Sequence, residues 1–228
     1  MASEVDIVNI ALSHLGADAV VTQLKPPDGS VEAGHGARFY PIARRTALAA
    51  HSWTFARTHV ALAQLVNDLS EWTYRYALPQ DCLRARRVIA SANSYDLGAA
   101  DYEIEGGALY TNQSGAVLIY TRDVTDTTKY PADFVTGLGM LLAGYLAGPI
   151  IKGREAITIG DAWTKAGLNA LREAAVRDAN ASQDSSNVTA RPALHPGGAG
   201  TNGAPLNTAA LDGILDNIAS AVWNKVLP

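Results

Sequence analysis

The chain has 228 residues and a formal net charge of -4, and 48% of its residues are hydrophobic while 18% are charged. That much apolar sequence can build a real core, either as one domain with appendages or as two small domains. The acidic balance gives no electrostatic reason to grip phosphates, the single cysteine excludes an intramolecular disulfide framework, and the first residues lack the pattern of a secretion signal.

The first fifty residues predict two helices. Ser3 can cap the first one, whose apolar residues recur every three or four positions, and Gly16 supplies its stop. Ser30 can begin a second helix that reaches to about Ala50. We expect a kink in that helix because Pro41 removes a backbone donor.

A change of period then marks a passage from helix to strand. A further helix is predicted from Ala56 to Leu69, after which large residues alternate strictly at Trp72, Tyr74, Tyr76 and Leu78. Alternation predicts a strand with one aromatic face that packs into a core. An aromatic platform for single-stranded nucleic acid is the less favoured reading, because no basic groove flanks it.

Strand-like segments continue from Trp72 to Thr125, separated by turns that contain Gly or Asn. The turns at 105–108 and 112–115 have the length expected of consecutive hairpins, which predicts one small antiparallel sheet. Helical patterns return with Pro131 in the first turn of a helix to about Ile151.

A last long helix is expected from Ile159 to Ala181, with Thr158 and Asp161 placed like a capping box. From Ser182 the composition shifts to Ser, Asn, Gly, Pro and Thr, which predicts a linker that cannot form a core. An amphipathic helix ends the chain, with its apolar stripe at Leu211, Ile214, Leu215, Ile218 and Val222. On a polar tether it can dock on a partner or fold back onto its own domain.

These elements predict an α+β fold: a helical lobe with an inserted small antiparallel β lobe, and an extended C-terminal arm that ends in a helix. The expected divisions are residues 1–71 and 129–181 for the two parts of the helical lobe, 72–128 for the β lobe and 182–228 for the arm.

Four blocks of the sequence together resemble the tail tubular protein A family of podoviruses, the head-to-tail adaptors or gatekeepers. They are Asn9 to Gly16, His51-Ser52-Trp53-Thr54-Phe55-Ala56, Trp72 to Leu83, and Tyr130 to Phe134. The resemblance covers roughly Asp6 to Asn180 and gives no counterpart for the arm.

The resemblance implies a structural virion protein, made in the host cytoplasm, without enzymatic activity or cofactor. Twelve copies would form a ring that binds the portal on one side and a nozzle similar to tail tubular protein B on the other. The genome would pass through the channel without specific binding, and no membrane would be involved.

Three sets of residues follow as candidate functional positions. The core of the family motif comprises Trp53, Phe55, Trp72, Tyr74, Tyr76, Leu78 and Pro79. A portal-docking helix would use Leu211, Ile214, Leu215, Ile218, Val222 and Trp223. Possible subunit-interface charges are Arg44, Arg45, Arg84, Arg86 and Arg87.

Two other functions stay open on the sequence alone. Glu103 and Glu105 share one strand face, and a carboxylate pair is what a virion-associated peptidoglycan hydrolase would require. The uncharged run from Phe134 to Ile151 is just long enough for a single membrane span, although its glycines also suit a buried central helix. No histidine or cysteine spacing predicts a metal site.

Overall fold

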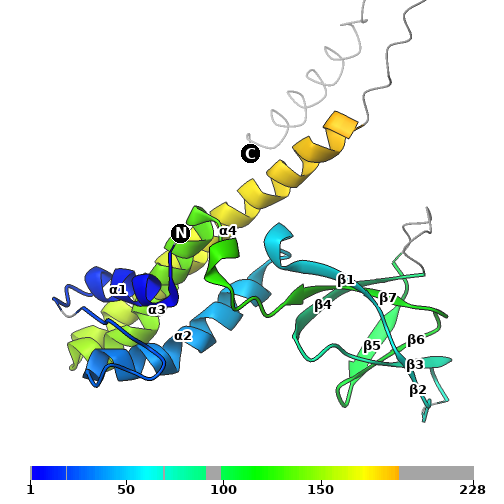
Figure 1. Ribbon diagram of the computed structural model, residues 1–228, viewed down its shortest axis with the longest axis horizontal. Helices are drawn as coiled ribbons and strands as arrows, with labels where there is room; N and C mark the ends of the chain where they lie inside the picture. The colour runs from blue at the N-terminus through cyan, green and yellow to red at the C-terminus, as the bar shows by residue number, and fades with distance from the viewer. Residues whose placement is uncertain (1, 19, 69, 91–98, 190–228) are drawn as a thin grey trace, which may run out of the picture. The chain divides into compact units, whose positions relative to one another are not determined.

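The structure is a computed structural model that describes residues 2–18, 20–68, 70–90 and 99–189, with side chains up to residue 181 (Figure 1). Its fold is α+β, as predicted, and the predicted terminal helix lies outside the described residues. The elements in chain order are α1 (Glu4–His14), α2 (Val31–Ala50), η1 (Thr54–Ala56), β1 (Arg57–Ala61), β2 (Gln64–Leu65), β3 (Tyr74–Ala77), β4 (Cys82–Ile89), β5 (Tyr102–Glu105), β6 (Ala108–Thr111), β7 (Val117–Arg122), η2 (Thr127–Lys129), α3 (Ala132–Ile151) and α4 (Glu155–Thr189).

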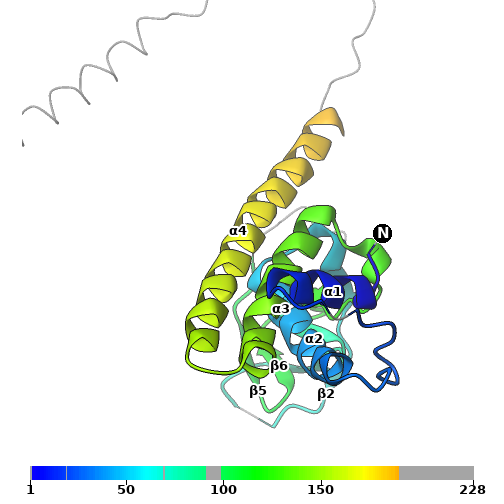
Figure 2. The same cartoon turned by 90° about the vertical axis from the view of Figure 1, so that its left-hand side faces the viewer.

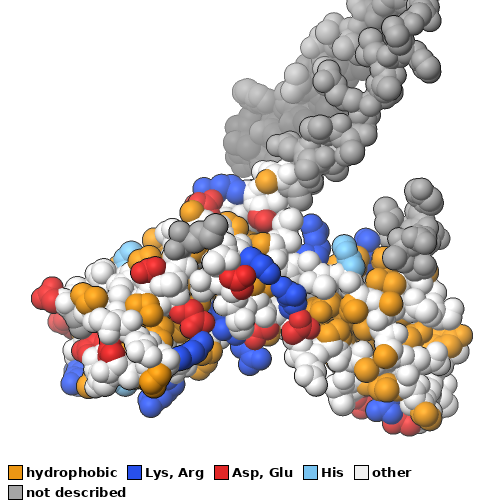
Figure 3. Space-filling model, in the orientation of Figure 1, with side chains coloured by type: hydrophobic (Ala, Val, Ile, Leu, Met, Phe, Trp, Pro, Cys, Tyr) orange, Lys and Arg blue, Asp and Glu red, His pale blue; other side chains and the backbone are white. Residues whose placement is uncertain are grey.

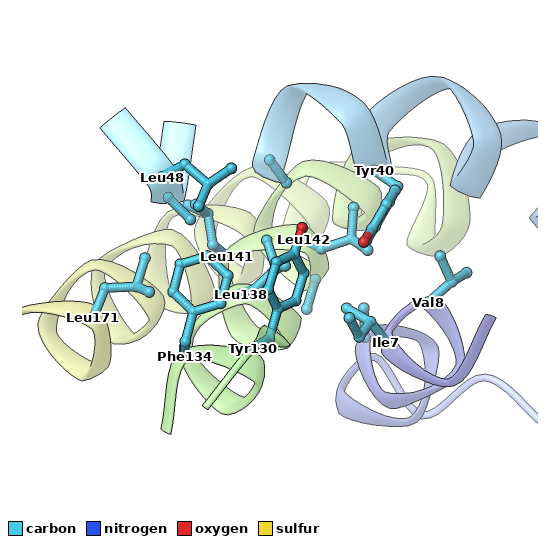
Figure 4. Packing of buried hydrophobic residues seen from close by; sticks show 14 of the residues in the cluster. Ile7, Val8, Tyr40, Leu48, Tyr130, Phe134, Leu138, Leu141, Leu142 and Leu171 are labelled. Atoms are coloured by element: carbon cyan, nitrogen blue, oxygen red, sulfur yellow. The ribbon is translucent and has the colours of Figure 1, made fainter. Parts of the chain in front are cut away.

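The central helix of the helical lobe is α3, which packs against α1, α2 and α4. Its inward residues Phe134, Leu138 and Leu142 meet Ile7 of α1 and Tyr40 of α2 in one continuous core (Figure 4). By length and composition α3 is apolar enough to cross a membrane, and 50% of its most apolar window is buried inside the fold. Packing on three sides favours a core helix over a membrane span.

Two of the predicted helix starts are confirmed by their hydrogen bonds. The Ser3 hydroxyl accepts from the backbone N–H of Asp6, and the Asp6 carboxylate accepts from the N–H of Ser3, which completes a capping box. The Ser30 hydroxyl accepts from the N–H of Ala33 at the start of α2. That helix continues through Pro41 to Ala50.

The limits predicted for the last helix are wrong. It begins at Glu155, so Thr158 and Asp161 lie inside it and form no cap, and it continues past Ala181 to Thr189. The early start follows from the close packing of α4 on α3, which includes Ala156 in the core. The extension is physically inexpensive, because each added residue gains a backbone hydrogen bond once a helix exists, even where Ser and Asn lower the propensity.

The helix predicted from Ala56 to Leu69 is also wrong, because this stretch forms η1, β1 and β2. Strand β1 pairs antiparallel with β7, and β2 pairs antiparallel with β3. The partner of β1 lies far along the chain and β2 pairs with the strand that follows the next loop, so the local spacing of apolar residues could not reveal either pairing. The β lobe therefore starts at Arg57, ahead of the predicted residue 72.

The β lobe has two antiparallel sheets in place of the single predicted sheet, with strand orders β1-β7-β4 and β2-β3-β6-β5. The hairpin between β5 and β6 is confirmed, with both turn glycines at positive φ. The second predicted hairpin is wrong, because residues 112–116 carry the chain from β6 in one sheet to β7 in the other.

The two sheets enclose one core and meet at both edges. Tyr76 and Leu109 of one sheet pack with Val88, Leu118 and Tyr120 of the other. At one edge the chain runs from β1 into β2, and at the other the N–H of Ala100 donates to the carbonyl of Val88. The result resembles a small closed barrel, which leaves few free backbone edges.

Helices α3 and α4 approach closely because glycines interlock along their contact. An added Cβ at Gly137 would come 2.8 Å from the Leu171 side chain, and one at Gly167 would come 2.5 Å from the Leu141 backbone nitrogen. Gly144 likewise faces Thr164 on α4. Gly137 and Gly144 thus serve a close helix crossing, whereas Gly148, at the other end of the small-residue spacing, takes no part in it.

We predict that Gly167→Ala lowers the free energy of unfolding by about 1–3 kcal/mol, because the new methyl group meets α3 backbone that cannot move without shifting the whole helix. Gly148→Ala is the matched control, since a Cβ there meets nothing within 4 Å. It should leave stability equal or raise it by up to about 1 kcal/mol. Urea unfolding followed by circular dichroism makes the comparison, and equal stabilities for both variants would contradict close packing of α3 on α4.

Candidate functional site

The two stretches of chain that connect the lobes meet in a cluster of four aromatic rings. Trp53 and Phe55 follow α2, whereas Tyr130 and Phe134 lie at the start of α3. The Phe134 ring centroid lies 5.0 Å from that of Trp53, 5.1 Å from that of Phe55 and 5.0 Å from that of Tyr130, each in a steep edge-to-face arrangement. Edge-to-face pairs add to the stabilisation from burial alone.

Hydrogen bonds fix the rings of Trp53 and Tyr130 and the turn that follows Trp53. The indole Nε1–H of Trp53, which is 1% exposed, donates to the carbonyl of Ala47 at 2.9 Å. The hydroxyl of Tyr130 donates to the carbonyl of Val124 at 2.6 Å, and burial raises the pKa of Tyr130 to about 12, so the phenol stays neutral at ordinary pH. Both backbone and hydroxyl donors of Thr54 reach the Asp178 carboxylate on α4.

An arginine of β4 joins the β lobe to the end of α2. Nη2 of Arg86 donates to the carbonyl of Ala49 at 2.9 Å and to that of His51 at 2.5 Å, and Nε donates to Thr121 Oγ1 on β7 at 2.9 Å. Burial lowers the pKa of Arg86, but a guanidinium remains protonated. Carbonyls at a helix C-terminus carry partial negative charge, so a cation is a favourable partner.

A second polar contact joins the lobes at the end of β7. The Asp123 carboxylate receives Arg44 Nη2 at 2.7 Å and Arg45 Nε at 3.0 Å, both from α2. The Arg44 side chain is only 8% exposed, so its pairing offsets the cost of burying the charge. Sequence reasoning did not identify Asp123, because 78 residues separate it from its partner Arg45.

Most of the arginines predicted at the subunit interface form hydrogen bonds or ion pairs within the chain. Arg44, Arg45 and Arg86 make the contacts described above. Arg84 is exposed and makes one long contact, 3.5 Å, to the carbonyl of Ala49. Two register shifts interrupt β4, so simple alternation does not decide which face of the sheet Arg84, Arg86 and Arg87 occupy. A role at a subunit interface stays a prediction for all five arginines.

The strand-entry residues of the family motif lie in or beside the core of the β lobe. Tyr76 is 1% exposed, and Tyr74 and Leu78 pack against that core. Trp72 precedes β3 and is half-buried, with its Nε1–H donating to Glu103 at 3.2 Å, and Pro79 is also half-buried. The predicted aromatic face is therefore mainly a packing face.

The acidic pair considered for catalysis is exposed. Glu103 and Glu105 both lie on β5, where Glu103 accepts the Trp72 hydrogen bond. Neither lines the pocket between α2 and α4, the one beside Trp72 or the one between α3 and α4. Among the residues that the structure describes, no group of three or more His, Cys, Asp or Glu side chains is placed to hold a metal ion.

Both lobes also expose apolar side chains. On the β lobe, Leu65, Val66 and Ile104 are 40%, 88% and 44% exposed, and the face in Figure 3 shows many apolar side chains there with few charges between them. On the helical lobe a groove of about 500 Å³ lies between the end of α2 and the middle of α4. This "α4 groove" is lined mainly by apolar side chains, with His51 and Arg172 at its polar positions.

No protein-family model matches the chain, and no curated protein matches its sequence.

We predict that Arg86→Met lowers the free energy of unfolding by about 2 kcal/mol, because the carbonyls of Ala49 and His51 lose a charged donor that water replaces poorly. Arg84→Met, two residues earlier on the same strand, removes only a long contact and should change stability by less than about 0.5 kcal/mol. Urea unfolding of the two variants beside the parent chain decides the point. A smaller loss of stability for Arg86→Met than for Arg84→Met would show that Arg86 does not hold the two lobes together.

Proposed function

We propose that this protein is the subunit of a head-to-tail adaptor ring of a podovirus, which joins the portal to the tail nozzle and surrounds the channel through which the DNA leaves. The observation that carries the proposal is the aromatic cluster. Trp53 and Phe55 come from one block of the family resemblance and Tyr130 and Phe134 from another, and the four rings pack together where the lobes join. Two blocks of the resemblance that pack against each other support it better than motifs scattered over the fold would.

Exposed apolar surfaces on both lobes give further support. A subunit that works by packing must present apolar area to its neighbours. The helical lobe presents the α4 groove, and the β lobe presents Leu65, Val66 and Ile104. In the proposed ring, copies pack side by side through the helical lobe, and the β lobe meets the next component of the tail.

The portal contact is assigned in this proposal to the apolar stripe at the end of the chain, from Leu211 to Trp223, which lies outside the described residues. Tethering raises the effective concentration of this segment once the ring contacts begin to form.

We predict that Ile218→Asp in the full-length chain weakens portal binding roughly tenfold or more, because a charge enters the middle of the apolar stripe. Ser220→Asp is the control, since residue 220 lies on the opposite side of a helix with that stripe. Binding to purified portal by surface plasmon resonance measures the difference. Equal affinity of both variants and the parent would reject the stripe as the portal contact.

The hydrolase alternative has a separate test. Glu103→Gln together with Glu105→Gln should leave portal binding unchanged, because both carboxylates are exposed on β5. The assay is the release of soluble fragments from purified peptidoglycan. If the parent chain releases them and the double variant does not, the protein is a hydrolase and the adaptor proposal fails.

A further inference from the structure

The α4 groove is an apolar surface with a positive rim. Its walls include Ala50 at the end of α2 together with Leu168, Ala175 and Val176 on α4, and Val176 is 61% exposed. The acids near it have partners within the chain, because Glu173 pairs with Arg177 and Asp178 accepts from Thr54. Arg172 lines the groove and is exposed, and none of the ion pairs among the described residues involves it.

Burial makes the other polar residue of the groove a poor source of charge. Desolvation lowers the pKa of His51, with Arg86 and Arg57 acting in the same direction against the opposing influence of Asp178. The imidazole is thus neutral at physiological pH, and the positive charge on the groove comes from Arg172. A partner that fits here needs an apolar projection with a carboxylate beside it.

The segment between α1 and α2 presents a projection of that kind. Val20 is 74% exposed and Val31, the first residue of α2, is 65% exposed. The two residues flank the turn that the Asp28 carboxylate ties together, and we call them the "valine knob". Glu32 follows Val31 in the first turn of α2 and supplies a carboxylate beside it. An acidic apolar projection is thus available on the same lobe as the basic apolar groove.

Hydrogen bonds hold the backbone around the knob in place. Asn9 of α1 makes two bonds of 2.9 Å with the backbone of Val21, which is itself 1% exposed. The Asp28 carboxylate accepts from Thr22 and from Ser30, which ties the two ends of the turn together. Apolar groups on a preorganised support lose little entropy on binding, which suits them to an interface.

The groove and the knob lie on different sides of the helical lobe. Figure 2 shows α4 on one side and the segment between α1 and α2 on the opposite side, with α1 and α3 between them. A symmetric pair of subunits uses the same patch on both copies, so it cannot bring together two complementary surfaces that lie on opposite sides. A contact between such surfaces on two copies would be head-to-tail, and a contact of this kind closes into a ring when the rotation per subunit allows it.

We propose that the valine knob of one copy occupies the α4 groove of the next copy, with Glu32 of the first facing Arg172 of the second. The proposal rests on the ring function and names the faces through which the ring closes. The charge pair fixes the register, and the burial of Val20, Val31 and Val176 supplies most of the affinity.

The test uses two full-length variants that each damage one surface. Val31→Asp spoils the knob and Val176→Asp spoils the groove, and each is expected to weaken self-association roughly ten- to hundredfold. Both positions are exposed, so melting curves should match the parent. Ile42→Asp, at a site 52% exposed on α2 and outside both surfaces, is the control that should assemble normally.

Mixing the two damaged variants distinguishes a head-to-tail contact from any other. Each retains one intact surface, so the mixture should give heterodimers by native mass spectrometry and no ring. In a separate pair, Arg172→Glu should weaken assembly and Glu32→Arg added to it should restore assembly in part. Rings formed by both valine variants would overturn this interface while leaving the adaptor function standing, and a parent chain that never self-associates, even with portal, would overturn both.

Discussion

The guanidinium of Arg86 holds the end of α2 against the β lobe by donating to the carbonyls of Ala49 and His51. The last carbonyls of a helix have no partner within the helix, so they normally bond to water or to a capping group. Here a charged side chain from another lobe is that group, and Thr121 orients it from β7. The helix end is therefore capped by a protein group only while the two lobes remain in contact, which makes this joint part of the fold of both.

The ion pairs of Asp123 and the aromatic cluster also hold the two lobes together. Asp123 receives two arginines of α2, and the ring of Phe134 contacts three other aromatic rings that enter from both connecting stretches. An assembly subunit needs such a joint, because a ring positions its next component only if the two ends of each subunit keep their relation. Interlocked glycines between α3 and α4 and the hydrogen-bonded turn beside Val21 extend this order to the surfaces proposed for self-association.

Local signals in the sequence were sufficient for the parts of the fold that depend on neighbours in the chain. Ser3 and Ser30 start helices because a hydroxyl can satisfy amides two or three residues on, and the glycines at 106 and 107 make a hairpin because they accept positive φ. The stretch from Ala56 to Leu69 was assigned to a helix because its apolar spacing fits one, whereas pairing with β7 and β3 decides its structure.

The candidate site shows the same division. Trp53, Phe55 and Tyr76 could be chosen from the sequence as packing residues, since large aromatics in a periodic pattern are seldom left in water. The roles of Arg86 and Asp123 could not, because an arginine on a strand reads equally well as an intersubunit charge and its partners lie more than thirty residues away in the chain. Complementarity between the α4 groove and the valine knob likewise exists only in three dimensions.

The most direct test of the account is the mass and symmetry of the purified full-length protein with and without portal, by native mass spectrometry and averaged electron images. A closed ring with rotational symmetry, seated on the portal, is the predicted result. A protein that stays a single chain at high concentration and leaves the portal bare would contradict the claim that it works as a building block.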